Sequence, residues 1–152
     1  MAETQRKKFP SWQNVAALLG EARMVLPGIQ VLFGFQLISV FSDGFQRLSS
    51  LQRSLHFVAL IASVVSAILV MTPAAYQRIA EKWQASSFFL RGSSYLIALA
   101  MAVLLISLTL EIWVVASIIF DTPAIAWIAA IGIACLGTGL WFAWPLSVRK
   151  PD

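Results

Sequence analysis

Four long apolar runs decide what this chain can fold into. They cover roughly residues 24–41, 55–72, 95–120 and 124–146, and each reaches about the 17–25 residues that cross a hydrocarbon core as a helix. Hydrophobic residues make up 59% of the 152 residues and charged residues only 12%, about half the charged share of a soluble domain. The pattern predicts an all-α, polytopic membrane protein, in which residues 1–152 form a single four-helix transmembrane domain with no separate soluble domain.

The distribution of lysine and arginine predicts the orientation. With the N-terminus inside, nine of the eleven basic residues lie on the cytoplasmic side, and only Arg47 and Arg53 lie outside. The positive-inside rule therefore places both termini in the cytoplasm. The net charge of +4 comes from basic residues beside apolar runs, so we expect anionic lipids at the cytoplasmic face as partners, and no nucleic acid.

Two segments outside the apolar runs have helical spacing. Ser11 is placed to cap a short amphipathic helix from Trp12 to about Ala22, which we expect to lie in the membrane interface before the first span. A plain extension of the first span explains the same residues equally well. In the cytoplasmic link 73–94, a second surface helix is predicted from four residues with helical spacing, Tyr76, Ile79, Ala80 and Trp83.

The first span carries an unusual number of polar residues for a membrane helix. At about 100° per residue, one stripe holds Arg23, Pro27, Gln30, Gly34, Leu37 and Phe41. Glu21, Gly28 and Ser39 fall nearly opposite, with Gln36 between the two sets. Two glutamines in one span act either as hydrogen-bonded contacts between helices or as the lining of a polar path, and both interpretations stay open.

His56 and Glu111 are the other chemically distinctive residues inside the spans. His56 begins a stripe that continues through Ser63 and Ser66, whose small side chains let helices approach closely. Glu111 is expected in the outer third of the membrane, on the same helix face as Ser107. An acid at this depth either exchanges protons, or reaches the outer interface or pairs with a partner such as His56, Arg53 or a neighbouring subunit.

The fourth span is rich in small residues. Small residues recur every four positions in two sets: Ala126, Ala130, Ala134 and Thr138, and Cys135, Gly139 and Ala143. Such spacing predicts close helix contacts, within one chain or between chains. Cys135 is the single cysteine and is interpreted as a packing residue. Without a Cys/His cluster, we expect neither a metal nor another cofactor.

Three segments resemble a family of small uncharacterised bacterial membrane proteins with four predicted spans. They are Glu21 to Phe33 (EARMVLPGIQVLF), Gln52-Arg53, and Pro73 to Arg78 (PAAYQR); similar proteins read E-x-R-x3-P-G-x-Q-V-L-F and A-P-A-A-Y-H-R there. The resemblance covers about residues 20–149 and implies a multi-pass protein of the bacterial inner membrane. It implies no established activity, although a cation/proton antiporter label is sometimes attached to such proteins. Gln77 replaces a histidine of many relatives, which argues against a proton relay in that link.

Two functions from different classes fit these observations. The first is a homo-oligomeric transport protein, an ion channel or an ion- or proton-coupled carrier, whose path is lined by the first span. Its candidate residues are Glu21, Arg23, Gln30, Gln36, His56 and Glu111, with Pro27, Gly28, Gly34, Ser63, Ser66, Ala130, Ala134 and Gly139 in helix packing. The alternative is a non-transporting scaffold, accessory subunit or lipid-binding protein. We do not expect an enzyme, because no Ser/His/Asp set or phosphate-binding glycine loop is present.

Overall fold

The protein is a bundle of long helices. The computed structural model describes residues 12–79, 87–120 and 122–148, and all the regular structure in these ranges is helical. Four of the helical stretches are long and apolar enough to cross a membrane. The predicted all-α, four-span class is therefore confirmed. In chain order the elements are α1 (Trp12–Ser39), α2 (Asp43–Gln46), α3 (Ser50–Ile79), α4 (Ser87–Ile119), α5 (Pro123–Thr138), a π-helical turn (Gly139–Ala143) and α6 (Trp144–Val148).

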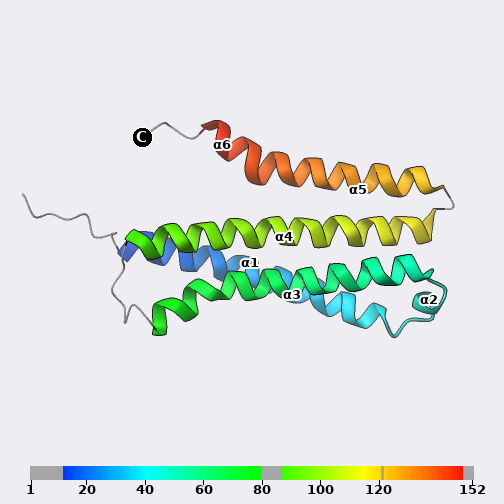
Figure 1. Ribbon diagram of the computed structural model, residues 1–152, viewed down its shortest axis with the longest axis horizontal. Helices are drawn as coiled ribbons and strands as arrows, with labels where there is room; N and C mark the ends of the chain where they lie inside the picture. The colour runs from blue at the N-terminus through cyan, green and yellow to red at the C-terminus, as the bar shows by residue number, and fades with distance from the viewer. Residues whose placement is uncertain (1–11, 80–86, 121, 149–152) are drawn as a thin grey trace, which may run out of the picture.

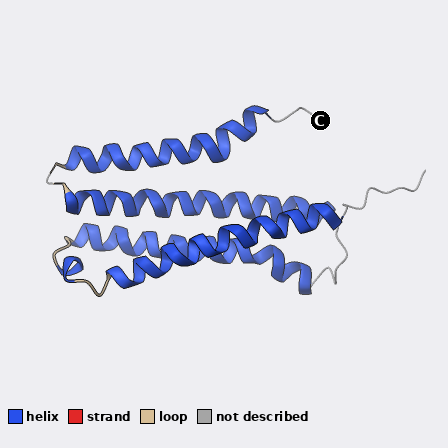
Figure 2. Cartoon of the chain, turned by 180° about the vertical axis from the view of Figure 1, so that it is seen from behind, coloured by secondary structure: helices blue, strands red, loops and turns tan. Residues whose placement is uncertain are grey.

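Three of the long helices form a compact core and the fourth lies beside it. Helices α1, α3 and α4 all contact one another, whereas α5 packs chiefly against α4. Figure 1 shows α5 on the side of α4 that faces away from α3. Seen from behind, α1 crosses the other two helices of the core obliquely (Figure 2). The start of α1 and the end of α6 lie toward the same end of the molecule, as an even number of spans requires.

The half of the core that contains the beginning of α1 has an apolar centre. Ala22 and Ile29 of α1 meet Val70 of α3 and Ala100 of α4, and all four side chains are buried. Alanine at two of these positions lets the helix backbones approach closely, which compensates in a membrane for the missing hydrophobic driving force. We call these four residues the apolar cluster.

Two helix ends differ from the sequence-based expectations. Helix α1 runs without a break from Trp12 to Ser39, so the extension of the first span, and not a separate interfacial helix, accounts for its first turns. Helix α3 continues through Pro73 as far as Ile79, with a bend near its C-terminal end (Figure 1).

The expected surface helix of the cytoplasmic link is therefore wrong for Tyr76 and Ile79, which belong to α3. Ala80 and Trp83 lie outside the described residues. The physical reason is that neighbouring helices support a membrane helix around a proline. Pro73 is buried in such packing and bends α3 without ending it.

The connections that follow α1 and α4 are short. Ser42 caps the single turn of α2, because its Oγ accepts a hydrogen bond from the Phe45 backbone N–H at 3.3 Å. The Asp43-Gly44 turn predicted from the sequence forms the start of this helix. On the other connection, α4 ends at Ile119 and α5 begins at Pro123, so these spans form the antiparallel hairpin that the sequence predicts.

Candidate functional site

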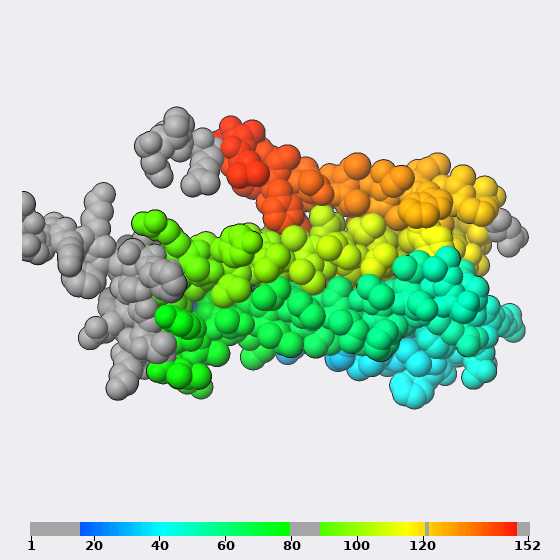
Figure 3. Space-filling model, in the orientation of Figure 1, coloured from blue at the N-terminus to red at the C-terminus, as the bar shows by residue number. Residues whose placement is uncertain are grey.

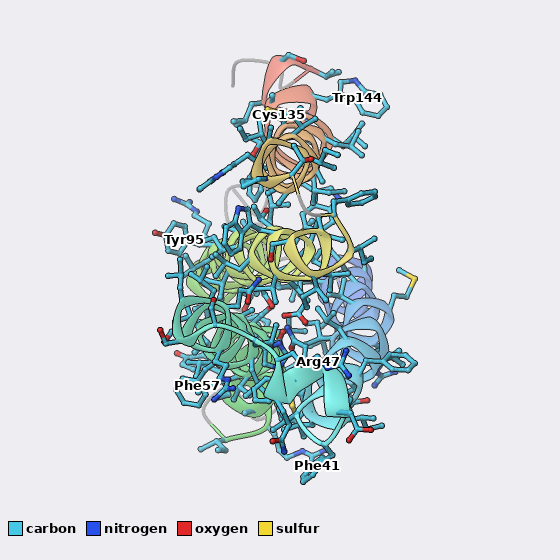
Figure 4. The ribbon with its side chains drawn as sticks, turned by 90° about the vertical axis from the view of Figure 1, so that its right-hand side faces the viewer. Phe41, Arg47, Phe57, Tyr95, Cys135 and Trp144 are labelled. Atoms are coloured by element: carbon cyan, nitrogen blue, oxygen red, sulfur yellow. The ribbon has the colours of Figure 1, made fainter. Side chains whose placement is uncertain are left out.

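Polar side chains from three helices meet inside the core of the bundle. Looking along the helices from the α2 end, nitrogen and oxygen atoms gather between α1, α3 and α4, whereas Phe57 and Tyr95 point outward (Figure 4). Each helix contributes two residues to this cluster, which we call the polar network: Gln36 and Ser39, His56 and Ser63, and Ser107 and Glu111. With the predicted orientation, the polar network lies in the outer half of the membrane.

The polar network is almost completely buried. Gln36 and His56 are 2% and 3% exposed, and Ser63 and Ser107 are fully buried. The side chain of Glu111 keeps 17% of its surface exposed. Since an unpaired polar group costs several kcal/mol in a membrane, roughly as in an apolar solvent, such burial requires hydrogen bonds for every member.

His56 and Glu111 form the centre of the polar network. The His56 Nδ1 atom lies 3.1 Å from both carboxyl oxygens of Glu111. The Nε2 atom on the other side of the ring lies 3.1 Å from the backbone carbonyl oxygen of Gln36 and 3.3 Å from the Ser39 hydroxyl. Of the alternatives for Glu111, pairing with His56 of the same chain is the contact that the structure contains.

The tautomer of His56 decides which of these contacts are hydrogen bonds. A backbone carbonyl only accepts hydrogen bonds, so the contact with Gln36 is one in the tautomer that carries its hydrogen on Nε2. The Nδ1 contact with Glu111 then needs one further proton, which sits either on the imidazole or on the carboxyl group. Both arrangements have zero net charge and the same hydrogen bonds. Removing this proton would place the lone pair of Nδ1 against a carboxylate, without a hydrogen bond between them.

Gln36 connects the pair to the two buried serines. Its amide nitrogen donates to Ser107 Oγ at 3.3 Å and to Glu111 Oε2 at 3.4 Å. Its amide oxygen accepts from Ser63 Oγ at 2.9 Å. The hydroxyls of Ser63 and Ser107 are 2.8 Å apart, and Ser107 also donates to the carbonyl oxygen of Ala59 at 2.7 Å. Glu111 accepts on one side and Ser63 donates on the other, so the amide of Gln36 has its nitrogen toward Glu111.

The surroundings of the polar network differ between its two ends. One helical turn from His56 toward the beginning of α3, Gln52 donates to Ser117 of α4 at 2.9 Å. The ring of Phe45 in α2 contacts the His56 ring edge-on, with 5.5 Å between the centroids. In the opposite direction along α3, Ser66 donates to the Ala100 carbonyl at 2.8 Å, and the apolar cluster follows. The end of the polar network near Gln52 is thus polar and is in contact with the ring of Phe45. The opposite end adjoins the apolar cluster.

The structure brings together three of the six pathway candidates. Gln36, His56 and Glu111 lie in the polar network, whereas Glu21, Arg23 and Gln30 are exposed on α1. The stripe through Arg23 and Gln30 therefore faces away from the interior of its own chain. Gln36 belongs instead to the buried face of α1, together with Ala22 and Ile29.

The predicted packing residues also fall into two groups. Ser63, Ser66 and Ala130 are buried between helices, and Ala134 is half-buried in a groove between α4 and α5. The other four, Pro27, Gly28, Gly34 and Gly139, are at least partly exposed. A Cβ atom added at any of these three glycines would have no neighbour within 4 Å in the described part of the chain.

A glycine that the sequence did not single out lies at a close contact between α5 and α4. A Cβ atom at Gly137 of α5 would overlap the end of the Leu105 side chain on α4, which would have to move to make room for it. Figure 3 shows α5 resting along α4. Nearby, Trp113 of α4 and Trp127 of α5 pack edge to face, with their ring centroids 5.7 Å apart.

The sequence reasoning misses four contributors to the site or its outer rim. From the sequence, Ser107 is predicted only to share a helix face with Glu111, and Ser39 only to lie opposite the stripe that contains Gln30. No role is predicted for Gln52 or Ser117. The available signal is spacing, because Gln52 lies one helical turn before His56 on the same face. Among the described residues, no group of three His, Cys, Asp or Glu side chains could hold a metal ion.

The four membrane-spanning helices and the polar network define a multi-pass membrane protein with a histidine–glutamate contact in its core. The chain belongs to DUF6328, a family of unknown function, whose model matches residues 2–145. Comparison with curated proteins and with solved structures finds no significant match.

Proposed function

We propose that this protein is a proton-coupled carrier of the bacterial inner membrane, and that the polar network is its proton-binding site. The observation that carries the proposal is the contact of His56 Nδ1 with both carboxyl oxygens of Glu111 at 3.1 Å, where one shared proton would have the same surrounding hydrogen bonds on either residue. Histidine and acid pairs inside membranes are typical of proton relays in transporters. Gln36 supports this role, because it orients the carboxyl group through one hydrogen bond.

The difference between the two ends of the polar network favours a carrier over an open channel. A carrier exposes its binding site to one side of the membrane at a time. Here the side chain of Glu111 is partly exposed, and Gln52 and Ser117 continue the polar surface outward. Ile29, Val70 and Ala100 separate the site from the cytoplasmic end. This arrangement corresponds to a state that faces outward.

A homo-oligomer remains part of the proposal because of Gln30. Its side chain is exposed in the middle of the first span, where an amide facing lipid lacks hydrogen-bond partners. The same residue of a second copy would supply them, since glutamine side chains hydrogen-bond across membrane helices. The transport path itself is placed within each chain, between α1, α3 and α4.

A non-transporting scaffold is the second candidate, and the complete pairing of the polar network favours it. Every side chain of the polar network has a hydrogen-bond partner in the chain, so the cluster also suffices to hold three helices in one register. A structural role predicts that stability depends on the polar network while no ion moves.

Flux measurements in liposomes separate the two candidates. Purified protein is reconstituted with a pH-sensitive dye inside, and a gradient of Na⁺ or K⁺ is imposed. For the wild type we expect protons to move across the membrane in the direction opposite to the cation. This movement should be lost in Glu111→Gln and Gln36→Leu. Ser66→Ala, which removes a buried hydrogen bond next to the polar network, is the matched control and should retain flux. Absence of flux in the wild type under either gradient or an applied voltage would rule out a carrier that couples protons to Na⁺ or K⁺.

A further inference from the structure

A groove between α1 and α3 opens on the surface near the cytoplasmic end. Arg23 and Leu26 of α1 line one part of it together with Met71 and Ala74 of α3. The same Met71 and Ala74 line a second hollow that extends to Arg78. Because the two hollows share these residues, they form one continuous surface, with volumes of about 140 and 340 Å³. We call it the arginine groove.

The charge of the arginine groove is positive. Arg23 and Arg78 are both exposed, and neither forms an ion pair with a described residue. No acid is present among the described residues that line the two hollows. Glu21, the acid nearest to Arg23 in the sequence, lies about 200° around α1 from it and therefore on another face.

The rest of the arginine groove is apolar and lies within the spans. Met71 is 55% exposed and Ile79 is 79% exposed, and the stretches that contain them are membrane spans. Arg78 lies in the last turn of α3, at the membrane boundary. Arg23 lies deeper, from where its long side chain can extend toward the same boundary while its methylene groups stay on apolar surface.

We propose that the arginine groove binds one anionic phospholipid. Its phosphate would contact Arg23 and Arg78, and an acyl chain would lie over Leu26 and Met71. A phospholipid accounts for both the charged end and the apolar length, whereas a free phosphate ion would account only for the charge. A second copy of the chain fits less well, because a two-fold contact there would bring like charges together.

Native mass spectrometry of the full-length protein tests this proposal. The protein in detergent is titrated with phosphatidylglycerol and with phosphatidylcholine of the same acyl chains. We expect one tightly bound phosphatidylglycerol and weaker phosphatidylcholine binding. Arg23→Gln or Arg78→Gln should each weaken phosphatidylglycerol binding by about fivefold, and the double variant should remove the preference. The corresponding double lysine variant should retain part of the preference, because lysine keeps the charge.

Control variants and a competitor make the test specific. Arg91→Gln removes an exposed arginine that does not line the arginine groove, and it should bind phosphatidylglycerol like the wild type. Equal binding of the two lipids, or an unchanged preference in the double glutamine variant, would overturn the proposal. So would displacement of the lipid by equimolar glycerol 3-phosphate, which would show that an anion alone is recognised. A change of oligomeric mass without a change in lipid adducts would assign the groove to a second copy instead.

Discussion

Replacing Glu111 with glutamine should separate the proton of the polar network from its hydrogen bonds. In the native protein, Glu111 meets His56 Nδ1 at 3.1 Å and accepts from Gln36 at 3.4 Å. A glutamine of the same shape can reproduce both contacts. Its amide N–H donates to Nδ1 of a neutral histidine, which still donates from Nε2 to the Gln36 carbonyl, and its amide oxygen accepts from the Gln36 side chain. The transferable proton alone is lost.

The magnitude follows from this count of hydrogen bonds. Since Glu111→Gln leaves no group without a partner, we expect the free energy of unfolding to change by less than about 1 kcal/mol. Glu111→Leu has a different outcome, because it removes the partner of His56 Nδ1 and one of the two acceptors of the Gln36 amide. Leaving a buried polar group unsatisfied costs about 1–3 kcal/mol, so the leucine variant should be destabilised by at least that amount.

Two measurements on the same samples check the argument. Thermal unfolding in detergent should rank the glutamine variant close to the wild type and the leucine variant well below both. Proton flux in liposomes should be lost in the glutamine variant in spite of its stability. If the glutamine variant unfolds as early as the leucine variant, the assignment of protons and hydrogen bonds is incorrect. If it is stable and transports like the wild type, the shared proton has no part in transport.

Three further predictions concern the surroundings of the site. Gly137→Ala should have a free energy of unfolding about 1 kcal/mol lower than Gly132→Ala, because the added Cβ atom displaces the Leu105 side chain whereas Gly132 has open space. Equal unfolding temperatures of the two variants would contradict the close α4–α5 contact. Phe45→Ala should increase the rate at which diethyl pyrocarbonate modifies His56, the single histidine, because the Phe45 ring packs against it. An unchanged rate would show that the Phe45 ring does not cover His56. With Cys135 replaced by alanine, Ser42→Cys should react with a membrane-impermeant thiol reagent from the outside of intact cells; labelling only in inverted vesicles would reverse the predicted orientation.

The spans could be predicted from the sequence because hydropathy measures the property that membrane insertion requires. Their ends could not be predicted as well. The apolar run of α3 stops near Met71, yet the helix continues through Gln77 and Arg78 to Ile79. Polar residues are tolerated where a helix enters the headgroup region, and Pro73 is supported by packing, so neither change in composition marks a helix end. Hydropathy patterns therefore locate a membrane helix more reliably than they locate its boundaries.

The site was predictable only in part, for a related reason. His56 and Glu111 stand out because they are titratable groups inside apolar runs, but their pairing depends on which helices become neighbours. In a membrane both the packed face and the lipid-facing face are apolar, so the pattern around Gln30 and Gln36 does not show which of them is buried. The contacts of Ile29 with Val70 and Ala100 turn Gln36 inward and leave Gln30 outside.

The attachment of α5 to α4 has a consequence for how the protein is made. All residues of the polar network lie between Gln36 and Glu111, and α5 begins only at Pro123. The first three spans can therefore satisfy their polar groups with one another while the ribosome is still synthesising the fourth. The last span then packs onto a completed three-helix unit through Gly137 and Trp127. The rest of the membrane domain can therefore fold before this span is inserted.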